Sequence, residues 1–205
     1  MLAVIVATAI RPDKVFDWFL ENGTVAVFLI VLAVSYKRLA LSDTSYLLTL
    51  AFLSLHEWGA HFKYYDDPIG EWMKALFGSQ RNPFDRVVHF SYGFFMSYPL
   101  QEWTMRVARV RNRARYAIPV AAILAFSALY EMLEAFAASV LSPERGEEFV
   151  GMQGDIWDSQ KDMCMAGLGA IAAMLIIAAV RHHAAKARVH SLAIQEPICV
   201  EETVS

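Results

Sequence analysis

Predominantly apolar blocks of about twenty residues constrain the fold of this chain more than any other feature of its sequence. The clearest are Val15–Tyr36 and Asp162–Arg181. Each is long enough to cross a hydrocarbon core of about 30 Å as a helix. Because a backbone inside a bilayer must satisfy its own hydrogen bonds, such blocks predict membrane-spanning helices. The composition agrees, since 57% of the residues are hydrophobic and only 19% are charged.

Three further blocks complete the pattern, namely Leu41–Phe62, Phe84–Met105 and Tyr116–Leu141. We therefore expect an all-α, polytopic integral membrane helix bundle with five full transmembrane spans. Met1–Ile10 is apolar, but at ~1.5 Å per residue it covers only about half of a hydrocarbon core. It predicts a short N-terminal apolar helix. Ile69–Phe77 is amphipathic and predicts a short helix lying in the membrane interface.

The distribution of lysine and arginine predicts the orientation, because basic loops remain in the cytoplasm. The loop Arg106–Arg115 contains five arginines, and placing it in the cytoplasm also puts Lys37-Arg38 there. The acidic segment Ser142–Lys161 then lies outside. Residues 1–181 are expected to form a single transmembrane helical domain, and 182–205 a polar cytoplasmic tail. The two cysteines, Cys164 and Cys199, fall on opposite sides of the bilayer, so no disulfide is expected between them.

Ionisable residues from several spans are expected at one depth near the outer surface. His56 and His61 end a span that runs outward, and Asp85 and His89 begin one that runs inward. At ~1.5 Å per residue, Glu131 lies about 22 Å above the inner end of its span. A charge inside a membrane helix costs at least ~2.5 kcal/mol, so such groups normally face a partner or a water-filled cavity.

The spacing of these groups favours a common site. Asp155, Asp158 and Asp162 follow one another at intervals of three and four residues, which place them on one helix face. The pairs Asp85–His89 and Glu131–Glu134 repeat that spacing. The four segments are far apart in the sequence, so we expect their side chains to meet in one cavity below the outer surface.

Carboxylates outnumber the cations near this expected site. The cations are Arg86 and Lys161, and a deficit of positive charge is what a divalent metal relieves. Mixed imidazole and carboxylate ligands favour Zn, Mn or Fe. The carboxylates counted are Glu57, Asp85, Glu131, Glu134, Asp155, Asp158 and Asp162.

One hypothesis is therefore a metal-dependent hydrolase that acts on a lipid or lipid-linked substrate at the outer leaflet. Glu131 or Glu134 would serve as the general base or acid. Six residues are predicted as metal ligands: His56, His61, Asp85, His89, Asp158 and Asp162.

Two other classes of function remain open on the sequence. The carboxylates are also suited to a proton- or ion-coupled transporter, although few polar residues continue into the inner half of the spans. A structural or partner-binding protein would use the polar cluster to lock the bundle. For Asp85–Arg86 and Lys161–Asp162, ordinary ion pairs at helix ends are the simpler interpretation. The net charge of −3 says nothing about nucleic acid, but no basic-aromatic patch or nucleic-acid motif appears, so we expect membrane lipids and no nucleic acid as partners.

Four motifs together resemble the YjdF-type family of bacterial inner-membrane proteins. They are His56–His61, Arg81–Phe90, Tyr130–Glu134 and Gln153–Asp162, and the resemblance extends from about Arg11 to Arg181. It implies a polytopic protein of the bacterial inner (plasma) membrane, in a family without an assigned activity. The resemblance supports the architecture and leaves the chemistry open.

Overall fold

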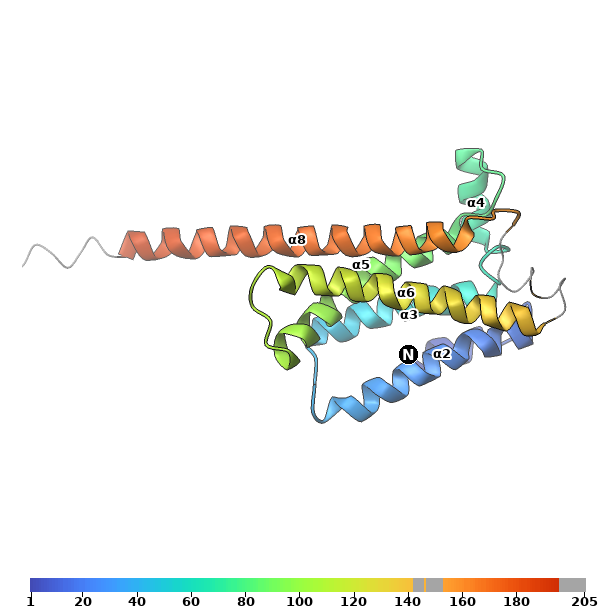
Figure 1. Ribbon diagram of the computed structural model, residues 1–205, viewed down its shortest axis with the longest axis horizontal. Coiled ribbons are helices and arrows are strands. Elements are labelled where there is room, and N and C mark those ends of the chain that lie inside the picture. Colours follow the sequence, from blue (N-terminus) through green and yellow to red (C-terminus); the bar gives the residue numbers. More distant parts are fainter. Residues whose placement is uncertain (142–145, 147–152, 196–205) are drawn as a thin grey trace, which may run out of the picture.

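The computed structural model describes residues 1–141, 146 and 153–195, and every regular element in this part of the chain is a helix. The acidic residues Glu144, Glu147 and Glu148 and the second cysteine, Cys199, lie outside the described residues. The helices are arranged as in Figure 1. Their bounds are α1 Leu2–Thr8, α2 Val15–Tyr36, α3 Asp43–His61, α4 Pro68–Phe77, α5 Phe84–Val107, α6 Ala114–Val140 and α8 Asp158–Gln195.

Three of the described helices are long and apolar enough to cross a bilayer. They are α2, α6 and the part of α8 from Asp158 to Arg188. The helices α3 and α5 occupy the second and third predicted spans, with 19 and 24 residues. Charged residues, among them Asp85, Glu102 and Arg106, lower the apolar character of α5. The all-helical class is confirmed, but the count of five full spans is not.

Helix α8 continues well past the predicted end of the last span. The span was expected to end at Arg181, whereas the helix runs to Gln195. Figure 1 shows this extension projecting beyond the other helices. The residues between Arg181 and Gln195 include several alanines, Lys186 and Arg188, which favour helix, and none of them is glycine or proline. The first part of the predicted polar tail is therefore helical.

The most extensive contact between helices joins α5 to α8. A Cβ atom at Gly93 would overlap the carbonyl oxygen of Ala166, and one at Gly169 would overlap that of Phe90. Only glycine permits these two backbones to approach so closely. The adjoining core contains Met96 of α5, Ile123 of α6, and Ala166 and Ala170 of α8. This packing fixes the start of α8 beside the start of α5.

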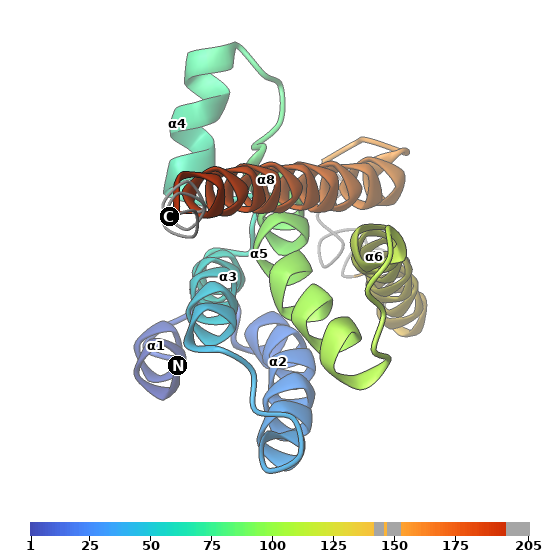
Figure 2. The ribbon, with the colours of Figure 1, turned by 90° about the vertical axis from the view of Figure 1, so that its left-hand side faces the viewer.

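The short helix α4 confirms the helix expected over Ile69–Phe77, and it projects sideways from the bundle near the start of α8 (Figures 1 and 2). Asp67 caps its first turn by accepting a hydrogen bond of 2.8 Å from the Gly70 amide. Gly78 ends the helix in the left-handed conformation, with φ of 62°. The Trp58 indole also donates to Asp67, so α4 is attached to the end of α3.

Helix α2 is less tightly packed than α3, α5, α6 and α8. Its main neighbour is α3, and Figure 2 shows it apart from α6 and α8 when the bundle is viewed from one end. Many of its apolar side chains, including Val27, Ile30, Val31 and Val34, are exposed, as expected for a helix that faces lipid. One side of the bundle is consequently covered only by a loosely packed helix.

Candidate functional site

Arginine side chains tie the acidic start of α8 to the start of α5. The Arg86 guanidinium donates to the carboxylates of Asp158 and Asp162. It also donates to the Asp158 carbonyl oxygen over 2.9 Å. Arg81 pairs with Asp158 from the preceding loop. The sequence analysis identified Arg86 as a cation near this site, but it did not identify Arg81.

Asp155 lies at the edge of this group and belongs to the loop before α8. The Lys161 ammonium lies 2.6 Å from one Asp155 carboxylate oxygen. This hydrogen bond lowers the pKa of Asp155 below its usual value. Asp155 also lies 3.3 Å from Arg86, and Lys161 therefore pairs with Asp155, whereas Asp162, its partner in the simpler interpretation, pairs with Arg86.

His89 lies against two carboxylates at the centre of the cluster. Its Nε2 atom lies 3.5 Å from Oδ1 of Asp85 and 3.6 Å from Oε1 of Glu131. These separations are too long for hydrogen bonds. They are close to roughly 3.4 Å, the spacing of neighbouring ligand atoms around a tetrahedral cation with bonds of about 2.1 Å. Asp162 completes the group, because Asp85, His89 and Asp162 each offer one ligand atom within 4.8 Å of the other two.

Three buried polar atoms in this region have no hydrogen-bond partner among the described residues. They are Oδ1 of Asp162, Oε1 of Glu131 and Nε2 of His56. The three residues are only 2%, 7% and 6% exposed. Leaving a buried polar atom unpaired costs about 1–3 kcal/mol, and more for a charged group. Such atoms are therefore expected where a cation, a proton or a ligand belongs.

His56 joins the cluster through residues that the sequence analysis did not identify. Its Nδ1 atom lies 2.8 Å from the Tyr64 hydroxyl, and its Nε2 atom lies 3.9 Å from Oε2 of Glu21. The Tyr130 hydroxyl donates to the same Glu21 oxygen over 2.5 Å. Glu21 carried a usable signal, because it is an acidic residue within an apolar span. Tyr64 carried no such sequence signal, since it lies in a turn.

One predicted ligand, His61, and one of the counted carboxylates, Glu57, do not join the cluster, and a second predicted ligand, Asp158, is already paired. His61 turns toward α1, where its Nδ1 atom lies 2.8 Å from the Thr8 carbonyl oxygen. Five residues separate it from His56, which rotates it by about 140° around the helix. Glu57 also turns to α1 and accepts from the Thr8 hydroxyl over 2.8 Å. Asp158 forms ion pairs with Arg81 and Arg86, and it lies outside the Asp85–His89–Asp162 group.

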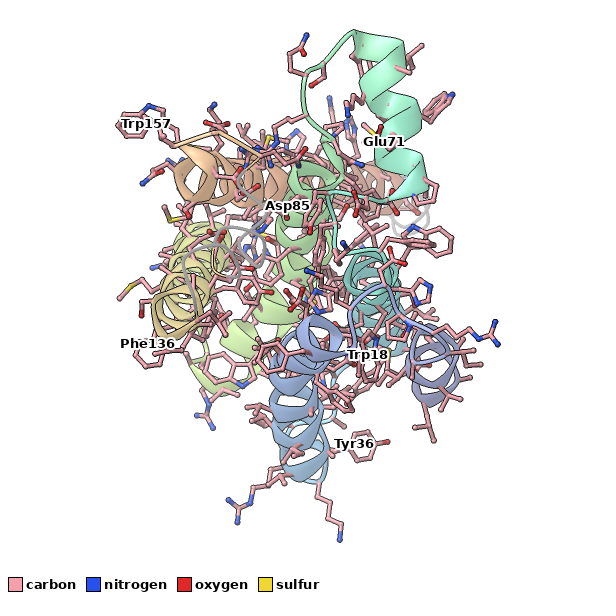
Figure 3. The ribbon with its side chains drawn as sticks, turned by 90° about the vertical axis from the view of Figure 1, so that its right-hand side faces the viewer. Trp18, Tyr36, Glu71, Asp85, Phe136 and Trp157 are labelled. Atoms are coloured by element: carbon pink, nitrogen blue, oxygen red, sulfur yellow. The ribbon has the colours of Figure 1, made fainter. Side chains whose placement is uncertain are left out.

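A cavity of about 1090 Å³ reaches this cluster from the bundle interior. It is lined by α2, α3, α5 and α6, and Asp85, His89 and Glu134 contribute to its polar end. Figure 3 looks onto this end and shows Asp85 inside the ring of helix ends, with Phe136 and Trp157 at the periphery. The predicted catalytic residues differ in position, because Glu131 contacts His89 whereas Glu134 lines the cavity.

Comparisons with known proteins agree with this architecture. The family model described as "Predicted membrane protein (DUF2238)" matches residues 1–183. The chain is 30% identical over 176 residues to "Inner membrane protein YjdF" of Escherichia coli (strain K12), which covers 85% of this chain and 84% of the relative. No solved structure matches the chain.

Proposed function

The chain belongs to the DUF2238 family of predicted membrane proteins, and from this premise we propose that it is a metal-dependent hydrolase of lipids or lipid-linked substrates. The metal would lie between Asp85, His89, Glu131 and Asp162. The family membership agrees with the resemblance found in the motifs, and it assigns no chemistry. The proposal therefore rests on the geometry of this cluster.

The observation that carries the proposal is the position of His89 Nε2. It faces two carboxylate oxygens at 3.5 Å and 3.6 Å, where no hydrogen bond forms but two bonds to a shared cation would fit. The Glu131 oxygen at 3.6 Å has no hydrogen-bond partner among the described residues, and the unpaired Oδ1 atom of Asp162 supplies one further lone pair. One imidazole with several carboxylates suits Zn, Mn or Fe.

The same geometry supports a hydrolytic reaction. A bound metal lowers the pKa of its water toward ~7, which provides a nucleophile at neutral pH. The water oxygen would attack the ester carbon or phosphorus, and its proton would pass to the Glu134 carboxylate at the cavity wall. The bond to the leaving alcohol then breaks, and the alcohol oxygen takes up that proton. Glu131, beside His89, acts as a ligand in this scheme.

The orientation of the chain completes the proposal. With the basic Arg106–Arg115 loop in the cytoplasm, the cluster lies at the outer side of the membrane. The C-terminus then lies in the cytoplasm, and α3 and α5 cross the membrane beside α2, α6 and α8. The inner membrane is the expected location, as in the name of the Escherichia coli relative.

Elemental analysis of purified protein tests the metal site. After incubation with Zn²⁺, Mn²⁺ or Fe²⁺ and removal of the excess, we expect about one ion per parent chain. His89→Ala and Asp85→Asn should lose it. Glu57→Gln is the matched control, because this carboxylate is fully buried but bonds to Thr8, away from the cluster. A parent protein that retains none of the three metals would overturn the proposal.

A structural role is the second candidate, and the arginine network favours it. Arg86 joins Asp158 and Asp162 of α8 to α5, which is how a buried ionic network would lock two helices. On this reading, His56→Asn and Glu131→Gln would lower the melting temperature in detergent, and metal would change nothing. The metal proposal predicts instead that metal changes the melting temperature of the parent protein. One set of variants therefore separates the two candidates.

A further inference from the structure

The cavity that reaches the cluster has one polar end and a long apolar remainder. The charged and imidazole side chains in its lining are His56, Asp85, His89 and Glu134. All of them lie where α3 ends, α5 begins and α6 nears its end. Beyond them the lining is mainly apolar, down to Trp103 and Ile118 at the opposite end. A molecule that fills such a space must be amphipathic.

The dimensions of the apolar part match the tails of a membrane lipid. From Tyr92 to Thr104, the lining residues of α5 advance about 18 Å at ~1.5 Å per residue. Half of a hydrocarbon core measures about 15 Å. At about 1090 Å³ the cavity lies at the upper end of the range of about 300–1,000 Å³ found for pockets that hold drug-sized molecules. It therefore has room for a ligand larger than a single short chain, such as a two-chain lipid.

The charge of the polar end distinguishes between lipid head groups. Among the described residues that line the cavity there is neither lysine nor arginine, whereas Asp85 and Glu134 are acidic. Glu21 lies directly behind this wall, where it contacts Tyr130 and His56. The nearest arginine, Arg86, is engaged with aspartates of α8. An ammonium group complements this end, and a head group whose net charge is negative does not.

We propose that the cavity binds one two-chain glycerophospholipid with an ammonium head group, with the tails along α5 and the ammonium at Glu134, beside the proposed metal ligand Asp85. This inference names the substrate class of the proposed hydrolase and so rests on that function, although lipid occupancy can be measured without metal or turnover. The lipid enters beside α2, the helix that packs mainly against α3. Its phosphodiester then lies next to His89.

Gly23 offers a way to close the cavity without disturbing the cluster. It lines the cavity from α2, and a Cβ atom at this position meets no other atom within 4 Å. Gly23→Phe should therefore fold and place its ring in the space that the tails would occupy. Gly23→Ala is the matched control, because one methyl group removes little of the volume.

The experiment reconstitutes parent and variants into vesicles of equal amounts of phosphatidylethanolamine and phosphatidylglycerol, and then counts retained lipids by native mass spectrometry in mild detergent. The parent should retain one lipid, with at least fivefold preference for phosphatidylethanolamine. Gly23→Phe should lose it, while Gly23→Ala keeps it, and Glu134→Gln should reduce the preference to below twofold.

The outcomes separate this inference from the metal proposal. Retained lipid that mirrors the vesicle composition and persists in Gly23→Phe would overturn the inference, since it would be bulk lipid on the outer surface. A preference for phosphatidylglycerol would overturn the head-group assignment. Lipid retained by a protein that takes up no metal would overturn the hydrolase alone, and metal uptake without retained lipid would overturn only the lipid site.

Discussion

Helix α5 carries a single carboxylate toward its C-terminus and a cluster of carboxylates near its N-terminus, and the two are paired in opposite ways. Toward its C-terminus, Glu102 accepts hydrogen bonds from the amide and hydroxyl of Ser42, at 3.0 Å and 2.8 Å, and from the Ser45 hydroxyl. Arg106 pairs with it over 2.5 Å. Near the N-terminus of α5, by contrast, the cluster of Asp85 with His89, Glu131 and Asp162 leaves buried oxygens unpaired.

This contrast separates a structural use of charge from a functional one. Glu102 is satisfied from all sides and fastens the first turn of α3 to α5, so it stabilises the bundle. The unpaired cluster costs stability, and such a cost is retained where a site needs it. The predictions that follow test whether the two ends of α5 respond differently to the same kind of change.

The largest effect is expected from Gly93→Ala. Its methyl group would overlap the Ala166 carbonyl oxygen and push α8 away from α5. Overpacking usually costs about 1–3 kcal/mol, and a clash with backbone lies at the upper end. Because Asp162 lies on α8 whereas the partners of Glu102 lie on α3, only the acidic cluster should be disrupted.

Thermal unfolding and metal content of Gly93→Ala check this together. Gly23→Ala is the control, since its added methyl group meets nothing within 4 Å. A melting temperature of Gly93→Ala equal to that of the parent would mean that α5 and α8 do not pack this closely.

The second prediction concerns metal added to the parent protein. A ligand that binds only the folded state at one hundred times its Kd stabilises by about 2.7 kcal/mol. We expect a rise in melting temperature with Zn²⁺ or Mn²⁺, measured by differential scanning fluorimetry. His89→Ala should abolish the rise, whereas Glu102→Gln should keep it. An equal rise in both variants would place the metal elsewhere.

The third prediction is that Glu102→Gln lowers the free energy of unfolding by about 2 kcal/mol, because it weakens hydrogen bonds to a charged acceptor. Chemical denaturation in detergent measures the change. Glu71→Gln serves as control, since Glu71 is half-exposed and its ion pair with Lys74 is long, at 3.3 Å. That control should change by less than about 0.5 kcal/mol.

The fourth prediction is that a Glu→Gln substitution in the cluster at the other end of α5 does not lower the stability of the protein. In metal-free protein, Glu131→Gln should leave stability unchanged or raise it by about 1 kcal/mol, because it removes one of several adjacent buried carboxylates. The same substitution at Glu102, whose carboxylate is fully paired at the other end of α5, should lower stability. A clear loss of stability in Glu131→Gln would show that this residue is structural, and the contrast between the two ends would fail.

The smallest effect is expected at Asp155, the exposed member of the acidic run. Its hydrogen bond with Lys161 lowers the pKa of Asp155 from the usual 3.8. The stabilisation is thus present above pH 3.8 and lost as the pH falls through the lower pKa of the folded state. Asp155→Asn should therefore differ slightly from the parent by a constant amount between pH 5 and 7. Melting curves that diverge within that range would contradict this assignment.

The sequence predicted the bounds of the individual helices better than it predicted which side chains from different helices meet. The bounds of α2 match the prediction, and those of α3, α5 and α6 match within a few residues, because apolar block length and polar breaks are local properties. The end of α8 was missed, since polarity marks the end of a span but does not end a helix whose residues favour it. The membership of the cluster was predicted only in part, with Glu21 and Arg81 missing.

What the sequence by itself determined is the class of the protein, its apolar helices and the kinds of ionisable residue that lie near their ends. The tertiary structure decided which of these residues meet: His56 turns inward and His61 turns away, Arg86 is shared by Asp158 and Asp162, and Glu21 comes in from α2. The physical reason is that the rotation and crossing of each helix depend on close contacts such as Gly93 on Ala166, which join segments far apart in the chain.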